Sequence, residues 1–250
     1  EVRSVLTVAA DGRGSRLRGQ SGLKVKDLGA PIDVFWMRLP RTPDGSAESL
    51  GRAGADGFLV LINRGDYWQC ALPFPKGAAE TIRAEGIEAF RARVGRLAPS
   101  LAHVTDSIAS WDDVKLLTVE VNRLETWWRT GLLCIGDAAH AMSPIGGVGI
   151  NLAVQDAAAA ARILAPSLRM GMASDDVLAS VQKRRAFPAR IAQSAQIAAQ
   201  NRVLVPAIQG AAAIKAPFFL KVLNVFPPLR GLTARAVGMG LRPEHWRAEP

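Results

Sequence analysis

Gly136-Asp137-Ala138-Ala139-His140 is the stretch that decides the fold, because it follows directly on the apolar run Gly131-Leu132-Leu133-Cys134-Ile135. An apolar run of this length predicts a parallel strand that is buried on both faces. Open α/β sheets bind ligands just beyond the carboxyl ends of their strands, and Asp137 stands there with a carboxylate that can accept hydrogen bonds from hydroxyl groups. The sequence therefore predicts an α/β fold with a ligand site at this turn.

A glycine-rich turn and an Ala-rich helix follow this stretch. Gly146, Gly147 and Gly149 have no Cβ and would let a flat ligand approach the backbone closely. The helix predicted over residues 149–164 points unpaired N–H groups and its positive end at the same place, which would stabilise an anion. An ordinary strand-to-helix turn shares single parts of this pattern. The block is distinguished by the combination of its parts, which are Asp137, His140, Pro144, the spaced glycines, Asn151 and Asp156.

This block resembles the second FAD-binding motif of the flavoprotein aromatic-ring hydroxylases, the family of para-hydroxybenzoate hydroxylase. The resemblance implies that Asp137 binds the ribityl chain of FAD, and that the backbone N–H groups of Ile150 and Asn151 face the pyrimidine edge of the isoalloxazine ring. It also implies that Pro144 lies beside the ring edge where oxygen adds. Val148 departs from the pattern, since many relatives carry a polar residue there. A side-chain contact with the flavin is therefore not expected from that position.

A second motif, Ala10-Asp11-Gly12-Arg13-Gly14-Ser15-Arg16-Leu17-Arg18, follows the apolar run over residues 5–10, which predicts another strand buried on both faces. Ser15 can cap a short helix, Asp11 can hold neighbouring N–H groups, and Arg16 or Arg18 can meet a pyrophosphate. The motif resembles the Asp-Gly motif that joins flavin binding to nicotinamide binding in the same family. The matching positions are Asp11, Gly12, Ser15 and Arg18. The implied cofactors are FAD and, as co-substrate, NADH or NADPH.

The segment between the two motifs is rich in strand patterns and predicts an antiparallel sheet. The strands are expected over residues 31–39, 58–63, 67–74 and 114–121, with a loop over 40–57 and one helix over 78–97. The resemblance implies that this segment binds the substrate and that its sheet covers one face of the flavin. Strand alternation sends only every second side chain to such a face, so each candidate pocket residue has a core position as its alternative. The candidates are Trp36, Met37, Tyr67, Trp68 and Gln69.

The sequence predicts three parts. Residues 1–21 and 126–165 form an FAD-binding domain, residues 22–125 an inserted antiparallel-sheet substrate domain, and residues 166–250 a helical C-terminal region, with a long helix in 175–202 despite Pro188. Neither an initiator Met nor the Gly-x-Gly-x-x-Gly unit that holds the adenine end in this family is present. We therefore expect an incomplete FAD-binding domain, excised or processed from a longer protein. Its parallel sheet would expose a long apolar edge, which invites self-association or a partner chain that supplies the missing unit.

Composition excludes several other classes of protein. With 250 residues and 49% hydrophobic residues the chain can bury a sizeable core. The net charge is +9, but the 31 Lys and Arg are scattered, so we expect no nucleic-acid binding and instead a positive field that attracts anionic dinucleotides and carboxylated substrates. Prolines and lysines interrupt the most apolar stretch, residues 203–229, so no membrane span is expected. Cys70 and Cys134 are expected to be buried thiols of a cytoplasmic protein without a metal site.

The resemblance implies an FAD-dependent monooxygenase that uses NAD(P)H and O2 to hydroxylate a phenolic or heteroaromatic substrate through a flavin C4a-hydroperoxide. The cofactor carries this chemistry, so no catalytic acid or base is nominated. His140 is expected to be a satisfied structural group. Two alternatives stay open. One is another flavin enzyme of the same fold, a reductase of prenyl groups or a halogenase, although the Trp-x-Trp-x-Ile-Pro signature of halogenases is not found. The other is an inactive subunit or remnant that needs a partner chain.

Overall fold

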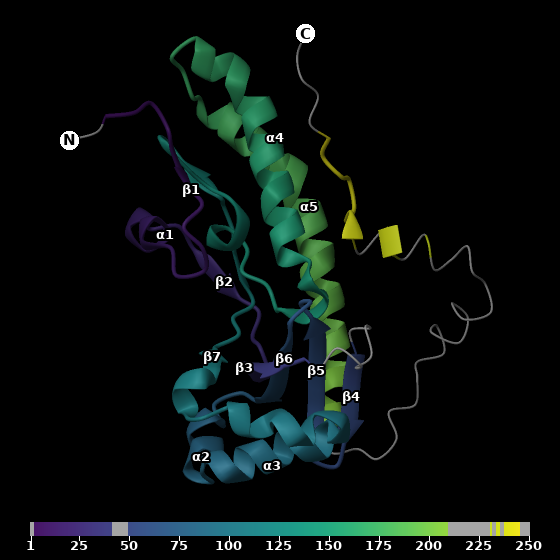
Figure 1. The fold of residues 1–250 in the computed structure, drawn as a ribbon. Coiled ribbons are helices and arrows are strands. Elements are labelled where there is room, and N and C mark those ends of the chain that lie inside the picture. Colours follow the sequence, from purple (N-terminus) through teal and green to yellow (C-terminus); the bar gives the residue numbers. More distant parts are fainter. Residues whose placement is uncertain (1–2, 42–49, 210–230, 232–233, 236–237, 246–250) are drawn as a thin grey trace. The chain divides into compact units, whose positions relative to one another are not determined.

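A computed structural model describes residues 3–41, 50–209, 231, 234–235 and 238–245 (Figure 1). The fold is α/β, as predicted. The chain divides into two compact units, which are described separately. Unit 1 comprises Glu1–Gly29, Glu120–Ile197 and Ala216–Pro250, and unit 2 comprises Ala30–Val119 and Ala198–Lys215.

Unit 1 contains the two sequence motifs around a small sheet. In this sheet β1 pairs in parallel with β10, with Val8 opposite Leu133, and β10 pairs antiparallel with β9. A separate two-stranded ribbon joins β2 and β8 in antiparallel register. The elements are β1 (Thr7–Ala9), α1 (Arg16–Ser21), β2 (Val25–Asp27), β8 (Asn122–Leu124), β9 (Trp128–Arg129), β10 (Leu132–Cys134), a short 3-10 helix η3 (Gly136–Ala138), a second one η4 (Ile145–Gly147), α4 (Gly149–Arg169) and α5 (Asp175–Ala199).

Two long helices, α4 and α5, lie side by side and supply much of the core of unit 1 (Figure 1). Ala has the highest intrinsic helix propensity of all residues, so the Ala-rich sequence of α4 favours a helix. Leu152 and Leu164 of α4 share one apolar cluster with Leu178 and Val181 of α5 and with Leu133 of β10. The helices therefore fix the turn that follows β10.

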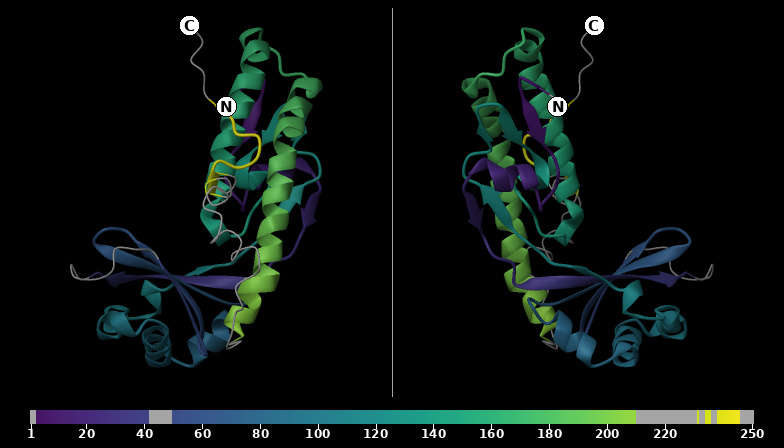
Figure 2. Two further views of the ribbon diagram at one scale, coloured as in Figure 1. Left: turned by 90° about the vertical axis from the view of Figure 1, so that its right-hand side faces the viewer. Right: turned by 90° about the vertical axis from the view of Figure 1, so that its left-hand side faces the viewer.

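Unit 2 is an antiparallel sheet with helices on one face (Figure 2). The strand order is β4-β5-β6-β3-β7, and the link between β5 and β6 turns at Gly65, whose φ of 95° favours glycine. The strands predicted over 58–63 and 67–74 are thus confirmed as the antiparallel neighbours β5 and β6. The elements are β3 (Ile32–Pro40), β4 (Leu50–Gly54), β5 (Gly57–Asn63), β6 (Tyr67–Pro75), α2 (Ala79–Ala84), α3 (Ile87–Leu97), the 3-10 helices η1 (Pro99–Ser107) and η2 (Trp111–Asp113), β7 (Lys115–Leu117), the π-helix η5 (Gln200–Leu204) and α6 (Val205–Ile208).

Strand alternation divides the side chains of this sheet between two faces. Phe35 and Leu39 of β3 and Phe74 of β6 point into the core with Phe90 and Val94 of α3. On the other face, Trp36 of β3 is partly exposed and Arg38 is exposed. Their register places Arg38 opposite Gln69 and Pro40 opposite Tyr67. One face of the sheet is therefore left for other contacts.

Four expectations from the sequence are wrong in detail. The loop expected over 40–57 contains β4, which pairs with β5. The run over residues 5–10 forms a strand of only three residues with Val8 41% exposed, because β1 has a neighbouring strand on one side only among the described residues; the apolar edge is therefore short. The helix expected over 78–97 is broken into α2 and α3, because Gly86 adopts a φ of 90° that no helix accommodates. The strand expected over 114–121 ends at Leu117.

The two units divide the chain at other residues than the three predicted parts do. The pairing of β2 with β8 places residues 22–29 and 120–125 in unit 1. Unit 1 also contains α5 as far as Ile197, which the sequence assigned to a separate helical region. The short helices expected in 203–229 fall largely on residues outside the described ones. The functional domain boundaries themselves stay a prediction.

One helical stretch among the described residues, Ile145–Arg169, has the length and the mean hydropathy of 1.2 that a membrane span needs. Length and composition alone are weak evidence, since the core helix of a soluble protein has both. This stretch contributes Leu152, Ala159, Ala160 and Leu164 to the core, and it contains the ion-paired Asp156 and Arg162. The absence of a membrane span stays a prediction.

Candidate functional site

Asp137 lies on the short 3-10 helix just beyond β10, where the sequence placed it. Its side chain is 28% exposed, and its Oδ2 accepts a hydrogen bond from Nη2 of Arg13 at 3.1 Å. Its Oδ1 lies 3.9 Å from the point where a Cβ on Gly149 would stand. A partly exposed carboxylate thus sits beside the first residue of α4, with no side chain between them.

The first turn of α4 is open to a ligand. The N-cap residue Val148 offers no side-chain acceptor, and the first N–H groups of a helix have no intrahelical partner. Ile150 is 71% exposed. The side-chain amide of Asn151 donates to the carbonyl of Gly238 at 2.9 Å, which orients this side chain toward the C-terminal segment and leaves the backbone N–H as the candidate contact with a ligand. This is the role that the sequence analysis gave it.

The turn before α4 carries the predicted glycines. Gly146 and Gly147 have φ angles of 76° and 62°, in the region that other residues rarely adopt. A Cβ on Gly147 would meet nothing within 4 Å, so the space beside it is open. Pro144 is half-buried at the start of this turn. The turn therefore exposes backbone where a flat group could lie against it.

The Asp-Gly motif folds as predicted. Ser15 caps α1 by accepting a hydrogen bond from the N–H of Arg18 at 3.0 Å, and Asp11 accepts one from the N–H of Arg16 at 3.1 Å. The hydrogen bond with Ser15 is the largest influence on the Asp11 carboxyl, and its pKa lies below the usual 3.8. Gly12, with a φ of 83°, makes the turn between strand and helix.

Arginine side chains connect the two motifs. Arg18 donates to the carbonyl of Ala138 at 3.4 Å, to Oδ1 of Asn122 at 3.3 Å and to the carbonyl of Arg13. Arg13 reaches Asp137. The guanidinium of Arg18 therefore bonds to the protein itself, and its meeting with a pyrophosphate stays a prediction. The two predicted motifs, far apart in sequence, form one site.

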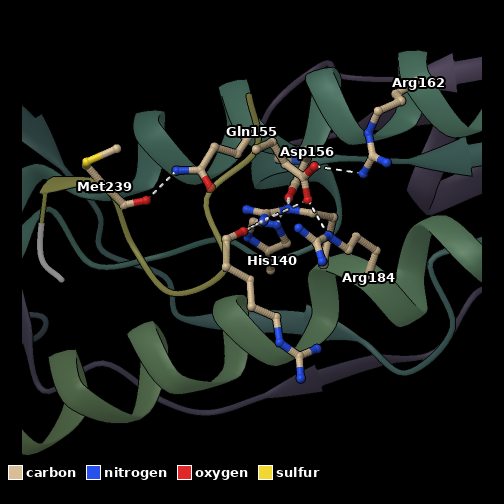
Figure 3. A network of polar contacts seen from close by, with 10 residues as sticks. His140, Gln155, Asp156, Arg162, Arg184 and Met239 are labelled. Carbon is tan, nitrogen blue, oxygen red and sulfur yellow. Dashed lines mark hydrogen bonds and ion pairs between the residues drawn. The ribbon is translucent and has the colours of Figure 1, made fainter. Parts of the chain in front are cut away.

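A buried ion network lies behind this site (Figure 3). Asp156, fully buried on α4, accepts hydrogen bonds from Nε2 of His140 at 2.5 Å, from Nε of Arg185 at 2.8 Å and from the N–H of Gly136 at 3.1 Å. Burial acts to raise the pKa of Asp156, but His140 and Arg185 outweigh it and hold the pKa below the usual 3.8. His140 is thus a buried structural group, as expected, although only its Nε2 is paired and its buried Nδ1 has no hydrogen-bond partner among the described residues.

The network continues to the C-terminal segment. Glu244, with a side chain 4% exposed, accepts from Nη2 of Arg162 at 2.8 Å and from Nε of Arg184 at 2.5 Å. Its Oε1 also lies 3.8 Å from Nη1 of Arg185. Sequence reasoning noted Asp156 but missed Arg185 and Glu244. Arg185 directly follows Lys183 and Arg184, so nothing local in the sequence distinguishes it as a buried ion-pair partner, and the same is true of Glu244.

The comparison with protein families identifies the family to which this chain belongs. A family model described as an FAD binding domain matches residues 1–195. The chain belongs to this family of FAD-binding domains. The match includes both motifs and the segment between them. The resemblance to flavoprotein hydroxylases that the motifs indicated is confirmed.

Relatives of this FAD-binding chain are monooxygenases by name. The 6-methylpretetramide 4-monooxygenase of Streptomyces rimosus is 33% identical over 236 residues, which cover 94% of this chain and 56% of that protein. The kynurenine 3-monooxygenase of Stenotrophomonas maltophilia is 29% identical over 66% of this chain and 39% of that protein. The crystal structure of PqsL, a probable FAD-dependent monooxygenase from Pseudomonas aeruginosa, superposes with a TM-score of 0.65 at 23% identity, over 84% of this chain and 58% of that one. The chain thus spans only about half the length of such relatives.

The residues present fit the ribityl and ring end of FAD. Asp137 offers a partly exposed acceptor, the uncapped start of α4 offers N–H donors, and the space beside Gly147 is open. The residues that would line this place from the two motifs are Asp11, Gly12, Ser15, Arg18, Asp137, Pro144, Gly146, Gly147, Gly149, Ile150 and Asn151. Their contacts with FAD stay predictions. Among the described residues no group of three His, Cys, Asp or Glu side chains could hold a metal ion.

The open face of the sheet in unit 2 has a cavity of about 860 Å³. Four of the five predicted pocket residues line it, namely Trp36, Met37, Tyr67 and Gln69. Met37 is only 3% exposed and belongs mainly to the core, as does Trp68, which does not line the cavity. Arg38 lies over the ring of Tyr67 at 4.8 Å, and sequence reasoning missed it. Its place at the second position after Trp36 was the available signal.

Proposed function

We propose that the chain carries the flavin-binding and substrate-binding parts of an FAD-dependent monooxygenase that uses NADH or NADPH and O2 to hydroxylate an aromatic substrate. The observation that carries this proposal is the pairing of Asp137 with the uncapped start of α4 across an open glycine turn. Membership of the FAD-binding family and relatives named as monooxygenases support it. FAD, when bound, supplies the chemistry that activates oxygen and transfers a hydroxyl group.

The residues of the chain orient the cofactor. Asp137 would accept hydrogen bonds from ribityl hydroxyls, and it would do so with the Oδ1 that Arg13 leaves free. The N–H groups of Ile150 and Asn151 would donate to the carbonyl edge of the ring, where the positive end of a 21-residue helix favours negative charge. Neither step requires a catalytic acid or base.

The open face of the sheet is the proposed substrate surface. Trp36 and Tyr67 supply aromatic area, and Gln69 supplies an amide that already accepts a hydrogen bond from Nε of Arg64 at 2.9 Å. An aromatic ring would stack on such a surface while polar groups orient it. NAD(P)H as the electron donor is proposed on the Asp-Gly motif, whose fold around Ser15 is the predicted one.

Loss of the Asp137 carboxylate tests the proposal. In an Asp137→Ala variant we expect the Kd for FAD, measured by quenching of flavin fluorescence, to rise about 10- to 100-fold, because a buried ligand hydroxyl loses its charged acceptor. Asp66→Ala, in an exposed turn, is the matched control and should leave the Kd unchanged. Wild-type protein that stays colourless after gel filtration with FAD would contradict the proposal.

Two other functions share this fold. A structural neighbour described as the Diels-Alderase PyrE3 has a TM-score of 0.67 at 21% identity and covers 92% of this chain, so the fold also serves a reaction of another class. Product analysis with NADPH and 18O2 distinguishes the two, because only a monooxygenase places labelled oxygen in its product. An inactive subunit that needs a partner is the other alternative. FAD binding without NAD(P)H oxidation, restored by a partner chain, would favour it.

A further inference from the structure

Asp156 is a buried charge that the proposed chemistry does not use. Its carboxylate accepts hydrogen bonds from three groups at once. Oδ2 accepts from the N–H of Gly136 at 3.1 Å and from His140 at 2.5 Å, at the two ends of the turn that carries Asp137, while Oδ1 accepts from Arg185 on α5 at 2.8 Å. Asp156 itself stands on α4. One side chain therefore joins the Asp137 turn to both long helices.

The contact between this turn and α4 is tight. A Cβ on Gly136 would lie 3.0 Å from the Cβ of Ala153, one helical turn before Asp156. The backbone of the turn closes on itself, since the N–H groups of Ala139 and His140 both donate to the carbonyl of Gly136 at 2.9 Å. The turn therefore packs closely against α4, and the charged residue of α4 that accepts its hydrogen bonds is Asp156.

Asp137 and the first turn of α4 must keep a fixed mutual position if both are to contact one flavin. The distance of 3.9 Å between Asp137 Oδ1 and the Cβ position of Gly149 depends on how the turn sits on the helix. A displacement of about 1 Å in a supporting group is enough to weaken a binding site strongly. The hydrogen bond from the N–H of Gly136 to Asp156 joins the turn to α4 at this place.

We propose that Asp156 is a positioning residue of the flavin site, which holds the Gly136–His140 turn against α4 so that Asp137 and the start of α4 bind the flavin together. The inference rests on the proposed function. His140 donates through Nε2, because the ionised carboxylate of Asp156 can only accept a hydrogen bond. Arg185 balances the charge of Asp156, which could not otherwise remain ionised at 0% exposure.

Glu244 provides a matched control within the same network. Its side chain is similarly buried and also accepts from two arginines, Arg162 and Arg184, but it does not touch the Gly136–His140 turn. Glu244→Gln should therefore lower stability without moving the turn. Asp156→Asn removes the charge at nearly constant size. The Asn side chain has one acceptor oxygen where the carboxylate has two, so it can accept hydrogen bonds on one side only. Asp156→Leu with Arg185→Met replaces the whole ion pair by apolar groups, which buried pairs often tolerate.

The experiment measures two quantities on the full 250-residue chain. The first is backbone hydrogen exchange over residues 136–140 without FAD. The second is the Kd for FAD. We expect both Asp156 variants to accelerate exchange in the turn and to raise the Kd about 10- to 100-fold, the range seen when partners of binding groups are removed. Glu244→Gln should leave the exchange of the turn and the Kd within about threefold of wild type.

Each other outcome overturns the inference. Unchanged exchange in the turn of the folded Asp156 variants would show that Asp156 does not hold it. Faster exchange with an unchanged Kd would show a purely structural residue. A Kd raised equally by Glu244→Gln would attribute the effect to general destabilisation. Wild-type chain that binds no FAD would overturn the proposed function and this inference with it, and it is distinguished from the other outcomes because it concerns no variant.

Discussion

Asp33 of β3 is the buried carboxylate that ties unit 2 together. It accepts from Nζ of Lys76 at 2.8 Å, from the N–H of Gly77 at 3.1 Å and from the N–H of Val119 at 2.9 Å. Burial acts to raise its pKa, but these donors outweigh burial and hold the pKa below the usual 3.8. Ionised Asp33 therefore stabilises the fold at every pH above 3.8, and this contribution disappears as the pH falls through the lowered pKa.

Asp33→Asn should lower the free energy of unfolding at pH 7 by about 1–3 kcal/mol, because the amide satisfies fewer of the three donors. Urea unfolding at pH 7 and again near pH 2.5 measures the difference between variant and wild type. The difference should shrink as the pH falls through the lowered pKa of Asp33. A constant difference at both pH values would show that the charge of Asp33 contributes nothing.

The two cysteines should be inert in the folded protein. Burial raises the pKa of the Cys70 thiol to about 12, and burial with the nearby Asp11 raises that of Cys134 to about 11, against an opposing effect of Arg18. The thiolate is the reactive form, so a disulfide reagent at pH 8 should modify neither residue until denaturant is added. Rapid modification of one thiol in native protein would contradict this expectation.

Single residues were predictable where their chemistry is local. Ser15 as a cap and Asp137 beyond a strand follow from neighbours in the sequence, and the structure places both as expected. The contacts of Asp156 with Arg185, and those of Glu244 with Arg162, join segments that only tertiary packing brings together. No local pattern determines such pairs.

At the scale of elements, α4 meets the Asp137 turn at Gly136. This glycine has a φ of 58°, and a Cβ there would lie 3.0 Å from Ala153. Gly136→Ala should therefore lower the free energy of unfolding by about 1–2 kcal/mol for the left-handed backbone and by about 1–3 kcal/mol more for the crowding. Thermal or urea unfolding measures the sum.

Gly147→Ala is the control for this prediction. Its φ of 62° is nearly the same, but its Cβ would meet nothing within 4 Å, so it should cost only the backbone strain. The difference between the two variants reports the contact with α4. Equal losses of unfolding free energy in the two variants would show that the turn can move away from α4 without a loss of stability.

The prediction of helices and strands succeeded for long segments whose residue pattern fits only one kind of element. The helix from Gly149 and the hairpin on either side of Gly65 are long, regular segments, and both were predicted. The ribbon of β2 and β8 was missed because three-residue polar strands have no periodicity to recognise. Helix 78–97 was predicted as one element because its apolar residues recur at helical spacing, whereas the positive φ of Gly86 ends the helical path.

At the scale of the whole molecule, the inserted sheet begins and ends at one place. β2 and β8, which precede and follow residues 30–119, pair with each other, with Val25 opposite Leu124. An insertion whose two ends lie together leaves the surrounding unit intact. The sequence predicted an insertion from the order of the motifs, but its exact limits depend on this pairing, which carries little local signal.

The net charge of +9 makes a prediction about rates. FAD carries a pyrophosphate, so its association should be accelerated by the positive field and should slow about tenfold or more as the ionic strength rises from about 0.01 M to about 0.5 M. Stopped-flow fluorescence measures the rate. Riboflavin has the same ring without the charge and is the control, and an equal salt dependence for both would exclude steering.

Trp127 gives the protein an optical probe at the proposed flavin site. Its indole is 2% exposed, and its ring centre lies 4.9 Å from that of His140, within the turn that carries Asp137. Flavins absorb light where tryptophan emits it, so a flavin bound at the turn would take up the excitation of Trp127 and dim its emission. The difference between the emission spectra of the wild type and a Trp127→Phe variant gives the contribution of Trp127 to the fluorescence. The occupancy of the site can then be followed without a label.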